Sequence, residues 1–208
     1  GYIELADRLA RRRFDGVPEL SFFAGGGAYT LPRAWLADGG EVVVAEIDPL
    51  VTDIARRRLW LEETAGLTVV HRDARVALAE RDDRFDVVVG DAFRDVTVPP
   101  HLVTREFSGL VRARLAPDGL YLVNVIDDPI RPVFAAAVAR TLEAVFADVT
   151  VWRRLGDADG ARRNYVLAAS DRPLALREVA GAPPYGRRWR TIELDLDAPL
   201  LTDDFAPV

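Results

Sequence analysis

The feature that most constrains the fold is a run of three glycines, Gly25-Gly26-Gly27, between an apolar stretch and the start of a helix. Residues 20–24 are short and mostly apolar, which is typical of a buried parallel strand. Leu31 to Leu36 then begins a helix. Glycine adopts the positive φ values of such a turn and lets a ligand approach the backbone closely. Strand, turn and helix therefore indicate the first half of a nucleotide-binding βαβ unit.

An acid on the next strand supports this interpretation. Residues 41–46 are predicted to form a strand that ends in Glu46, about twenty residues after the turn. At that spacing a carboxylate can accept both hydroxyl groups of a ribose. The sequence thus predicts a bound nucleoside contacted by Gly25, Gly26, Gly27 and Glu46. Asp48 belongs either to the same site or to the cap of a helix starting at Pro49, and both interpretations stay open.

Composition excludes several classes of protein. The 208 residues are enough for one domain, 1–208, with a sizeable core. The apolar runs are too short for a membrane-spanning helix, and with no signal peptide visible we expect a cytoplasmic protein. The absence of cysteine and the presence of only two histidines argue against a metal site. A net charge of −6 argues against nucleic acid as a partner and is compatible with cationic ligands.

Strands alternate with helices along most of the chain, which predicts a parallel sheet covered on both faces. The parallel strands are expected at residues 20–24, 41–46, 67–71, 85–90 and 120–126. Residues 149–154 and 165–169 read as a closing antiparallel hairpin. The predicted fold is therefore α/β, a Rossmann-like, mostly parallel sheet of about seven strands.

The two ends of the chain depart from this pattern. Residues 1–18 are expected to be the remnant of an N-terminal segment, with Gly1-Tyr2-Ile3 as a strand fragment and Glu4 to Phe14 as a helix. Because the chain starts at glycine and contains no methionine, residues are expected to be missing on this side. Residues 171–208 are rich in proline, glycine and charge, so we expect an irregular C-terminal extension.

Acids follow several of the predicted strands, and the carboxyl ends of parallel strands converge on one crevice. Asp73 either lies beside a ligand there or caps the helix starting at Ala74. Asp127 and Asp128, before a proline, are better explained as turn and cap. Asp91 differs because a buried strand delivers it directly to the crevice. A charge at that position is costly without a partner such as a cationic substrate.

Taken together, these residues resemble the spermidine synthase family of polyamine aminopropyltransferases, and within it the divergent bacterial branch. The resemblance implies a class I methyltransferase-like fold. Gly25-Gly26-Gly27 looks like the family's glycine motif, and Glu46-Ile47-Asp48 like its Glu-Ile-Asp, whose glutamate holds the ribose. Asp73-Ala74 is similar to the family's step beside the adenine. Asp91 matches the aspartate that binds and deprotonates the attacking amine.

The activity implied by this resemblance is aminopropyl transfer from decarboxylated S-adenosylmethionine to a polyamine or other amine, without a metal. Asp95 and His101, in the segment that follows Asp91, are the candidates for contacting that amine. We also expect a homodimer.

Departures from the family pattern leave alternatives open. Ala28 stands where the family usually has an aspartate that grips the amine of the donor. This favours an S-adenosylmethionine-dependent methyltransferase, because the full cofactor carries a carboxylate that an acid would repel. The altered loop at residues 92–95 would favour a catalytically silent nucleoside-binding module. A dehydrogenase is less favoured because Thr30 replaces the third glycine of its fingerprint.

Overall fold

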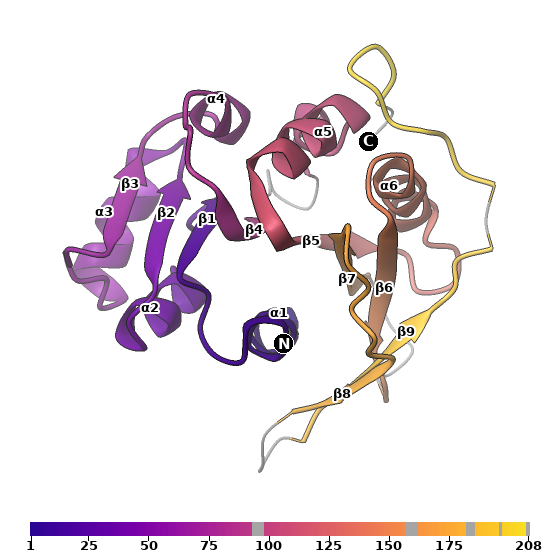
Figure 1. The fold of residues 1–208 in the computed structure, drawn as a ribbon, viewed down its shortest axis with the longest axis horizontal. Helices are drawn as coiled ribbons and strands as arrows, with labels where there is room; N and C mark the ends of the chain where they lie inside the picture. Colours follow the sequence, from indigo (N-terminus) through magenta and orange to yellow (C-terminus); the bar gives the residue numbers. More distant parts are fainter. Residues whose placement is uncertain (93–97, 157–161, 182–185, 196, 207–208) are drawn as a thin grey trace.

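The computed structural model describes residues 1–92, 98–156, 162–181, 186–195 and 197–206. These residues form a nine-stranded sheet in the order β3-β2-β1-β4-β5-β7-β6-β9-β8 (Figure 1). The first five strands of this order run parallel, and each later neighbour is antiparallel. The strands are β1 (Leu20–Ala24), β2 (Glu41–Ala45), β3 (Leu67–Val70), β4 (Phe85–Gly90), β5 (Leu115–Asp127), β6 (Asp148–Arg154), β7 (Arg163–Ser170), β8 (Glu178–Ala180) and β9 (Arg188–Ile192).

Helices cover both faces of the sheet. Buried residues of α1, α2 and α3 share one hydrophobic cluster, and those of α4, α5 and α6 share the other. The helices are α1 (Tyr2–Phe14), α2 (Thr30–Ala37), α3 (Pro49–Arg58), α4 (Ala74–Ala79), α5 (Arg105–Arg114) and α6 (Val133–Glu143), with a short 3-10 helix, η1 (Pro100–Leu102). The predicted α/β, Rossmann-like fold with a terminal antiparallel hairpin is confirmed.

The predicted number of strands was too low. The described part of the sheet has nine strands rather than seven, because β8 and β9 come from a region expected to be irregular. In β9 the side chain of Trp189 is buried while the flanking Arg188 and Arg190 are exposed. Both arginines bond to Glu178 on β8. Alternation over five residues is too short a pattern to separate from a charged loop.

The prediction of a strand fragment at residues 1–3 was also wrong. Residues from Tyr2 onward form α1. Four of its side chains are buried against the sheet, at the spacing of one helix face: Leu5, Ala6, Leu9 and Ala10. Burial of this face outweighs the preference of an aromatic and a β-branched residue for a strand.

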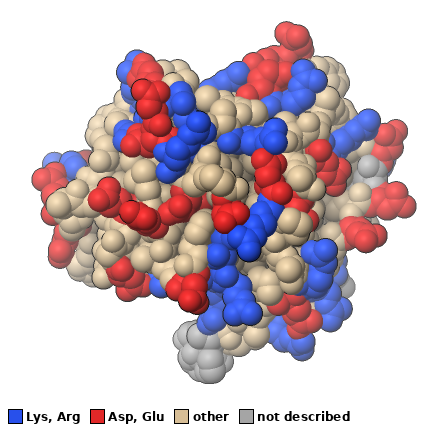
Figure 2. All heavy atoms as spheres, in the orientation of Figure 1, with Lys and Arg blue, Asp and Glu red and all other residues tan. Residues whose placement is uncertain are grey.

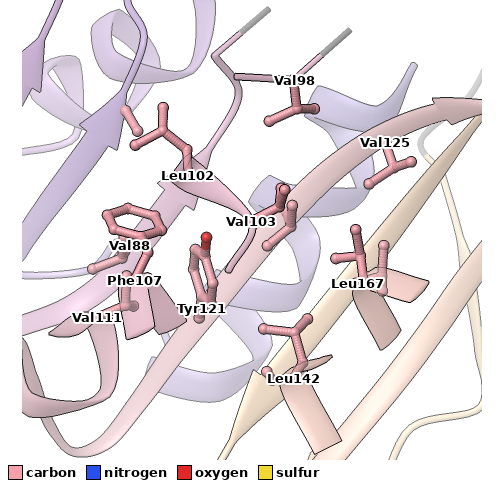
Figure 3. Packing of buried hydrophobic residues seen from close by; sticks show 14 of the residues in the cluster. Val88, Val98, Leu102, Val103, Phe107, Val111, Tyr121, Val125, Leu142 and Leu167 are labelled. Atoms are coloured by element: carbon pink, nitrogen blue, oxygen red, sulfur yellow. The ribbon is translucent and has the colours of Figure 1, made fainter. Parts of the chain in front are cut away.

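The core on the α5 side of the sheet shows how the strands are held (Figure 3). Val88 of β4 and Tyr121 of β5 are register partners and pack with Phe107 and Val111 of α5. All four side chains are almost completely buried. Burying each one contributes about 1.5–3 kcal/mol, so this contact fixes the strands whose ends form the crevice.

The segment 198–205, called here the C-terminal strap, crosses the helices on the same side. Asp203 accepts two hydrogen bonds from Arg75 of α4, at 2.7 and 2.6 Å. It also accepts one from the hydroxyl of Thr104, the residue that caps α5. These bonds lower the pKa of Asp203 to about 2. The backbone N–H of the buried Leu201 donates a hydrogen bond to the hydroxyl oxygen of Thr141 on α6 at 2.9 Å. The strap therefore joins α4, α5 and α6.

Charges are unevenly arranged on the surface. Figure 2 shows acids and bases interspersed over one face, with basic side chains gathered in a band through its lower centre. Although the chain as a whole has a net charge of −6, this face carries a local concentration of positive charge. Within the described ranges, none of the helices has the length and apolar character needed to cross a membrane.

Candidate functional site

The glycine turn is shaped by its own chain. Gly25 and Gly27 have φ values of 97° and 50°, as expected for positions that other residues resist. A β-carbon on Gly25 would lie 2.8 Å from the carbonyl oxygen of Asp91. One on Gly26 would lie 2.5 Å from the ring of Tyr29. From the sequence alone, these glycines are explained by the close approach of a ligand. In the structure they are already required because the turn itself packs closely against the residues that follow β4 and precede α2.

Tyr29 anchors the far side of the turn. It precedes α2 with a φ of 54° and is fully buried. Its hydroxyl lies 2.7 Å from the Thr52 hydroxyl of α3, which in turn lies 3.1 Å from Nε2 of His71. Three elements therefore fix where the turn sits, and His71 has a structural partner here.

Glu46 lies where two turns meet. Its Oε2 accepts the N–H of Gly26 at 2.9 Å, and its Oε1 accepts the N–H of Asp48 at 3.0 Å. The residue is 8% exposed. Each carboxylate oxygen has a further lone pair, so the side chain can still accept hydroxyl donors from a ligand.

Asp48 caps α3, and its side chain accepts the N–H of Leu50 at 2.9 Å. Of the two interpretations left open for Asp48, the cap is the one that these contacts support. Asp127 and Asp128 likewise accept backbone N–H groups, from Ala135 at 2.8 Å and from Ile130 at 2.7 Å. Their expected use as turn and cap is confirmed.

Asp73 caps α4 and also contacts His101. One oxygen accepts the N–H groups of Arg75 and Val76 at 3.0 and 3.1 Å, and the other lies 2.6 Å from Nε2 of His101. Burial opposes ionisation of Asp73, but the bonds from His101 and the backbone outweigh it and lower its pKa. Ala74 is buried as the first residue of α4. Asp73 therefore caps α4 with one oxygen and contacts His101 with the other.

Asp91 has a different environment. Its backbone N–H is held by the carbonyl of Ala24 at 3.1 Å, so the residue continues β4 beside the glycine turn. Its side chain accepts the hydroxyl of Tyr2 at 2.7 Å and the amide of Asn124 at 2.9 Å. Burial raises the pKa of Asp91, and the hydrogen bonds from Asn124 and Tyr2 oppose that shift. Asp91 is therefore a partly buried carboxylate held by side chains of α1 and β5.

A cavity of about 100 Å³ lies between the glycine turn and α1. Among its lining residues are the three glycines, Ala28, Asp91, Tyr2 and Asn124. Ligand pockets commonly measure about 300–1,000 Å³, so this cavity takes only part of a nucleoside-sized ligand. Glu46, Asp48, Asp73 and His101 are not among its lining residues. Asp95 lies outside the described residues.

Sequence reasoning missed Tyr2 and Asn124. Tyr2 was assigned to a strand, and only the helix brings its hydroxyl to Asp91. Asn124 carried a usable signal, because it is the one polar residue between Leu120 and Ile126. It is 4% exposed. A buried amide requires hydrogen-bond partners, and a partner at a strand end points to the crevice.

Comparison with known proteins gives relatives in both sequence and structure. No family model matches the chain. A probable polyamine aminopropyl transferase of Bifidobacterium longum is 33% identical over 189 residues, covering 78% of this chain and 42% of that protein. A polyamine aminopropyltransferase of Vibrio vulnificus is 27% identical over 219 residues, covering 96% of this chain and 72% of that protein. The chain thus spans less than half of the first relative.

Solved structures agree in fold. A probable spermidine synthase from Corynebacterium glutamicum has a TM-score of 0.71 at 24% identity, covering 82% of this chain and 64% of that one. Human methyltransferase-like protein 13, solved in complex with SAH, has a TM-score of 0.70 at 22% identity and 82% coverage of both chains. A spermidine synthase in complex with the transition-state analogue AdoDATO has a TM-score of 0.69 at 22% identity, covering 82% of this chain and 60% of that one. The resemblance to the spermidine synthase family is confirmed, at modest identity.

Proposed function

We propose that this protein transfers an aminopropyl group from decarboxylated S-adenosylmethionine to an amine of the polyamine class. The observation that carries the proposal is Asp91, a partly buried carboxylate at the end of β4 that lines a cavity beside the glycine turn. The two sequence relatives named above are described as aminopropyltransferases, and a structural relative was solved with a transition-state analogue of that chemistry.

The chemistry requires little more than alignment and a base. The sulfonium carbon of the donor is already activated, so the enzyme mainly orients a neutral amine toward it. A protonated amine has no lone pair to attack with. Asp91 binds the ammonium form, takes its proton and leaves the amine free to attack the carbon as the carbon–sulfur bond breaks. General-base help of this kind increases rates about 10²–10⁴-fold.

The remaining residues divide between the two substrates. We assign the nucleoside to Gly25-Gly26-Gly27, to Glu46 at the ribose, and to Asp73-Ala74 beside the adenine, with Asp48 holding the start of α3. Asp95 and His101 are assigned to the acceptor amine. A homodimer and a cytoplasmic location are also part of the proposal, and size measurement in solution tests the first.

A second candidate is an S-adenosylmethionine-dependent methyltransferase. Ala28 lines the cavity and supplies no carboxylate there, which would suit a donor that keeps its own carboxylate. The similar fold of a methyltransferase-like protein solved with SAH is compatible with this candidate.

The deciding experiment combines calorimetry with product analysis. Decarboxylated S-adenosylmethionine, S-adenosylmethionine, methylthioadenosine and NAD are titrated separately, and each donor is then incubated with a panel of diamines and polyamines. We expect the decarboxylated donor and methylthioadenosine to bind and an aminopropylated amine to form. Tight binding of full S-adenosylmethionine with methylated products would replace the proposal by the second candidate. Nucleoside binding with no product from any amine would indicate a silent module.

A further inference from the structure

A row of three polar side chains runs across the sheet to Asp91. Asn164 of β7 donates from Nδ2 to Oδ1 of Asn124 on β5 at 2.9 Å. Asn124 donates from its own Nδ2 to Oδ1 of Asp91, also at 2.9 Å. The second oxygen of Asp91 accepts the Tyr2 hydroxyl. Asn164 does not touch Asp91, but it is connected to it through one amide.

The orientation of the Asn124 amide matters for the charge of Asp91. An ionised carboxylate only accepts hydrogen bonds, so it requires the amide nitrogen to face it. If the amide were flipped, its carbonyl oxygen would face the carboxylate, and that contact is favourable only when Asp91 is protonated and donates. Asn124 is almost completely buried, so water cannot easily compensate a wrong orientation.

Asn164 distinguishes these two orientations. Its amide nitrogen faces the carbonyl oxygen of Asn124. After a flip of the Asn124 amide, its N–H donors would face those of Asn164 between β7 and β5, and the buried Asn124 amide would lose its acceptor. We propose that Asn164 is a positioning residue, which holds the Asn124 amide in the orientation that keeps Asp91 ionised and ready to take a proton. The proposal rests on the function proposed above, in which Asp91 is the base.

Among the residues that the structure describes, the other groups around Asp91 do not provide this control. From α1 the group that faces it is the Tyr2 hydroxyl, whose pKa burial and Asp91 both raise, so it stays protonated across the working pH range. From β5 it is the neutral Asn124, and from the glycine turn it is the backbone beside Gly25. Asn164 can therefore influence the ionisation of Asp91 through the orientation of the Asn124 amide.

The test measures the protonation of Asp91 directly. Aspartate carboxyl carbons are labelled with carbon-13, and the signal that disappears in Asp91→Asn identifies Asp91. Asn164→Leu removes the donor without adding a charge, and Asn164→Ala serves if the leucine variant does not fold. We expect either substitution to raise the titration midpoint of Asp91 by about one pH unit, which lowers the transfer rate about tenfold below that midpoint. Transfer at high pH and the affinity for methylthioadenosine should stay near wild type.

Thr150→Val is the matched control. Thr150 is buried in β6, its hydroxyl accepts the Trp152 indole N–H at 2.9 Å, and no hydrogen bond links it to Asp91. This variant also loses a buried hydrogen bond in the sheet, so it should lower the melting temperature without moving the midpoint of Asp91. Asn164→Gln, which keeps an amide, should restore part of the wild-type midpoint.

An unchanged Asp91 midpoint in the folded Asn164 variants would overturn the inference, whatever their stability. Equal shifts in Thr150→Val would do the same, because the effect would then be general loosening of the sheet. A wild-type protein that transfers nothing would contradict the proposed function instead. The carbon-13 titration would still decide whether Asn164 controls the ionisation of Asp91.

Discussion

The carboxyl ends of the parallel strands hold their acids in two different ways. On the β2–β3 side, Glu46, Asp48 and Asp73 each accept backbone N–H groups at neighbouring turns or helix starts. On the β4–β5 side, Asp91 is held by side chains that lie 89 and 33 residues away in the sequence. The backbone partners are in place wherever the turn or helix start forms. The side-chain partners of Asp91 are in place only when α1 and β5 have docked against β4.

The largest expected effect comes from removing the charge on the β4–β5 side. Asp91→Asn keeps the size of the side chain but removes its charge and nearly all its basicity. We expect the transfer rate to fall about 10²–10⁴-fold while the affinity for methylthioadenosine changes only a few-fold. Single-turnover kinetics and calorimetry measure the two quantities. Asp86→Asn is the control, since Asp86 accepts backbone N–H groups at the opposite end of β4.

The same variant makes a prediction about stability and pH. Burial raises the pKa of Asp91 above its unfolded value, so its stabilising contribution is present at low pH and is lost as pH rises through the raised pKa. Asp91→Asn should therefore melt at or above the wild-type temperature at neutral pH and lose that advantage in acid. Wild-type activity must fall as pH drops through the same range. Full activity of Asp91→Asn would leave the mechanism without its base.

A smaller effect is expected on the β2–β3 side, at Glu46. Glu46→Ala should weaken methylthioadenosine binding by about 1.5–3 kcal/mol, roughly 10- to 150-fold, the range for hydrogen bonds to a charged group. Calorimetry measures it, with Glu41→Ala as the control because Glu41 is exposed at the start of the same strand. Unchanged affinity would show that Glu46 does not bind the ribose and only connects the two turns through the N–H groups of Gly26 and Asp48.

The smallest effect separates the two roles of Asp73. Asparagine caps helices nearly as well as aspartate, so Asp73→Asn should keep the melting temperature and weaken adenosine-containing ligands a few-fold. Asp73→Ala also removes the helix cap, so it should lower the free energy of unfolding by about 1 kcal/mol and the melting temperature by about 2–4 °C. If the asparagine variant binds methylthioadenosine like the wild type, the helix cap is the only role of Asp73.

The sequence was most informative where local rules decide the structure. β1 and β4 were predicted at their observed bounds, because a short apolar run ending in a glycine turn or a single acid leaves few alternatives. The same holds for the acids of the β2–β3 side, whose partners lie in neighbouring turns. The role of Tyr2 could not be predicted, because its partner Asp91 lies 89 residues away in the sequence and the contact depends on how α1 docks on the sheet. Strands β8 and β9 were missed because they form through pairing, of β9 with β6 and of β8 with β9, and not through their own composition.

The C-terminal strap has a consequence for how the chain folds during synthesis. Asp203 and Arg75 are separated by 128 residues, so the contact that ties α4 to α5 closes only after residue 203 has left the ribosome. Contacts between residues so far apart in the sequence form late, because they require the ordering of a long loop. The sheet from β1 to β5 can assemble earlier, as the chain emerges. The helices over the proposed adenine side are thus expected to be the last part of the domain to become rigid.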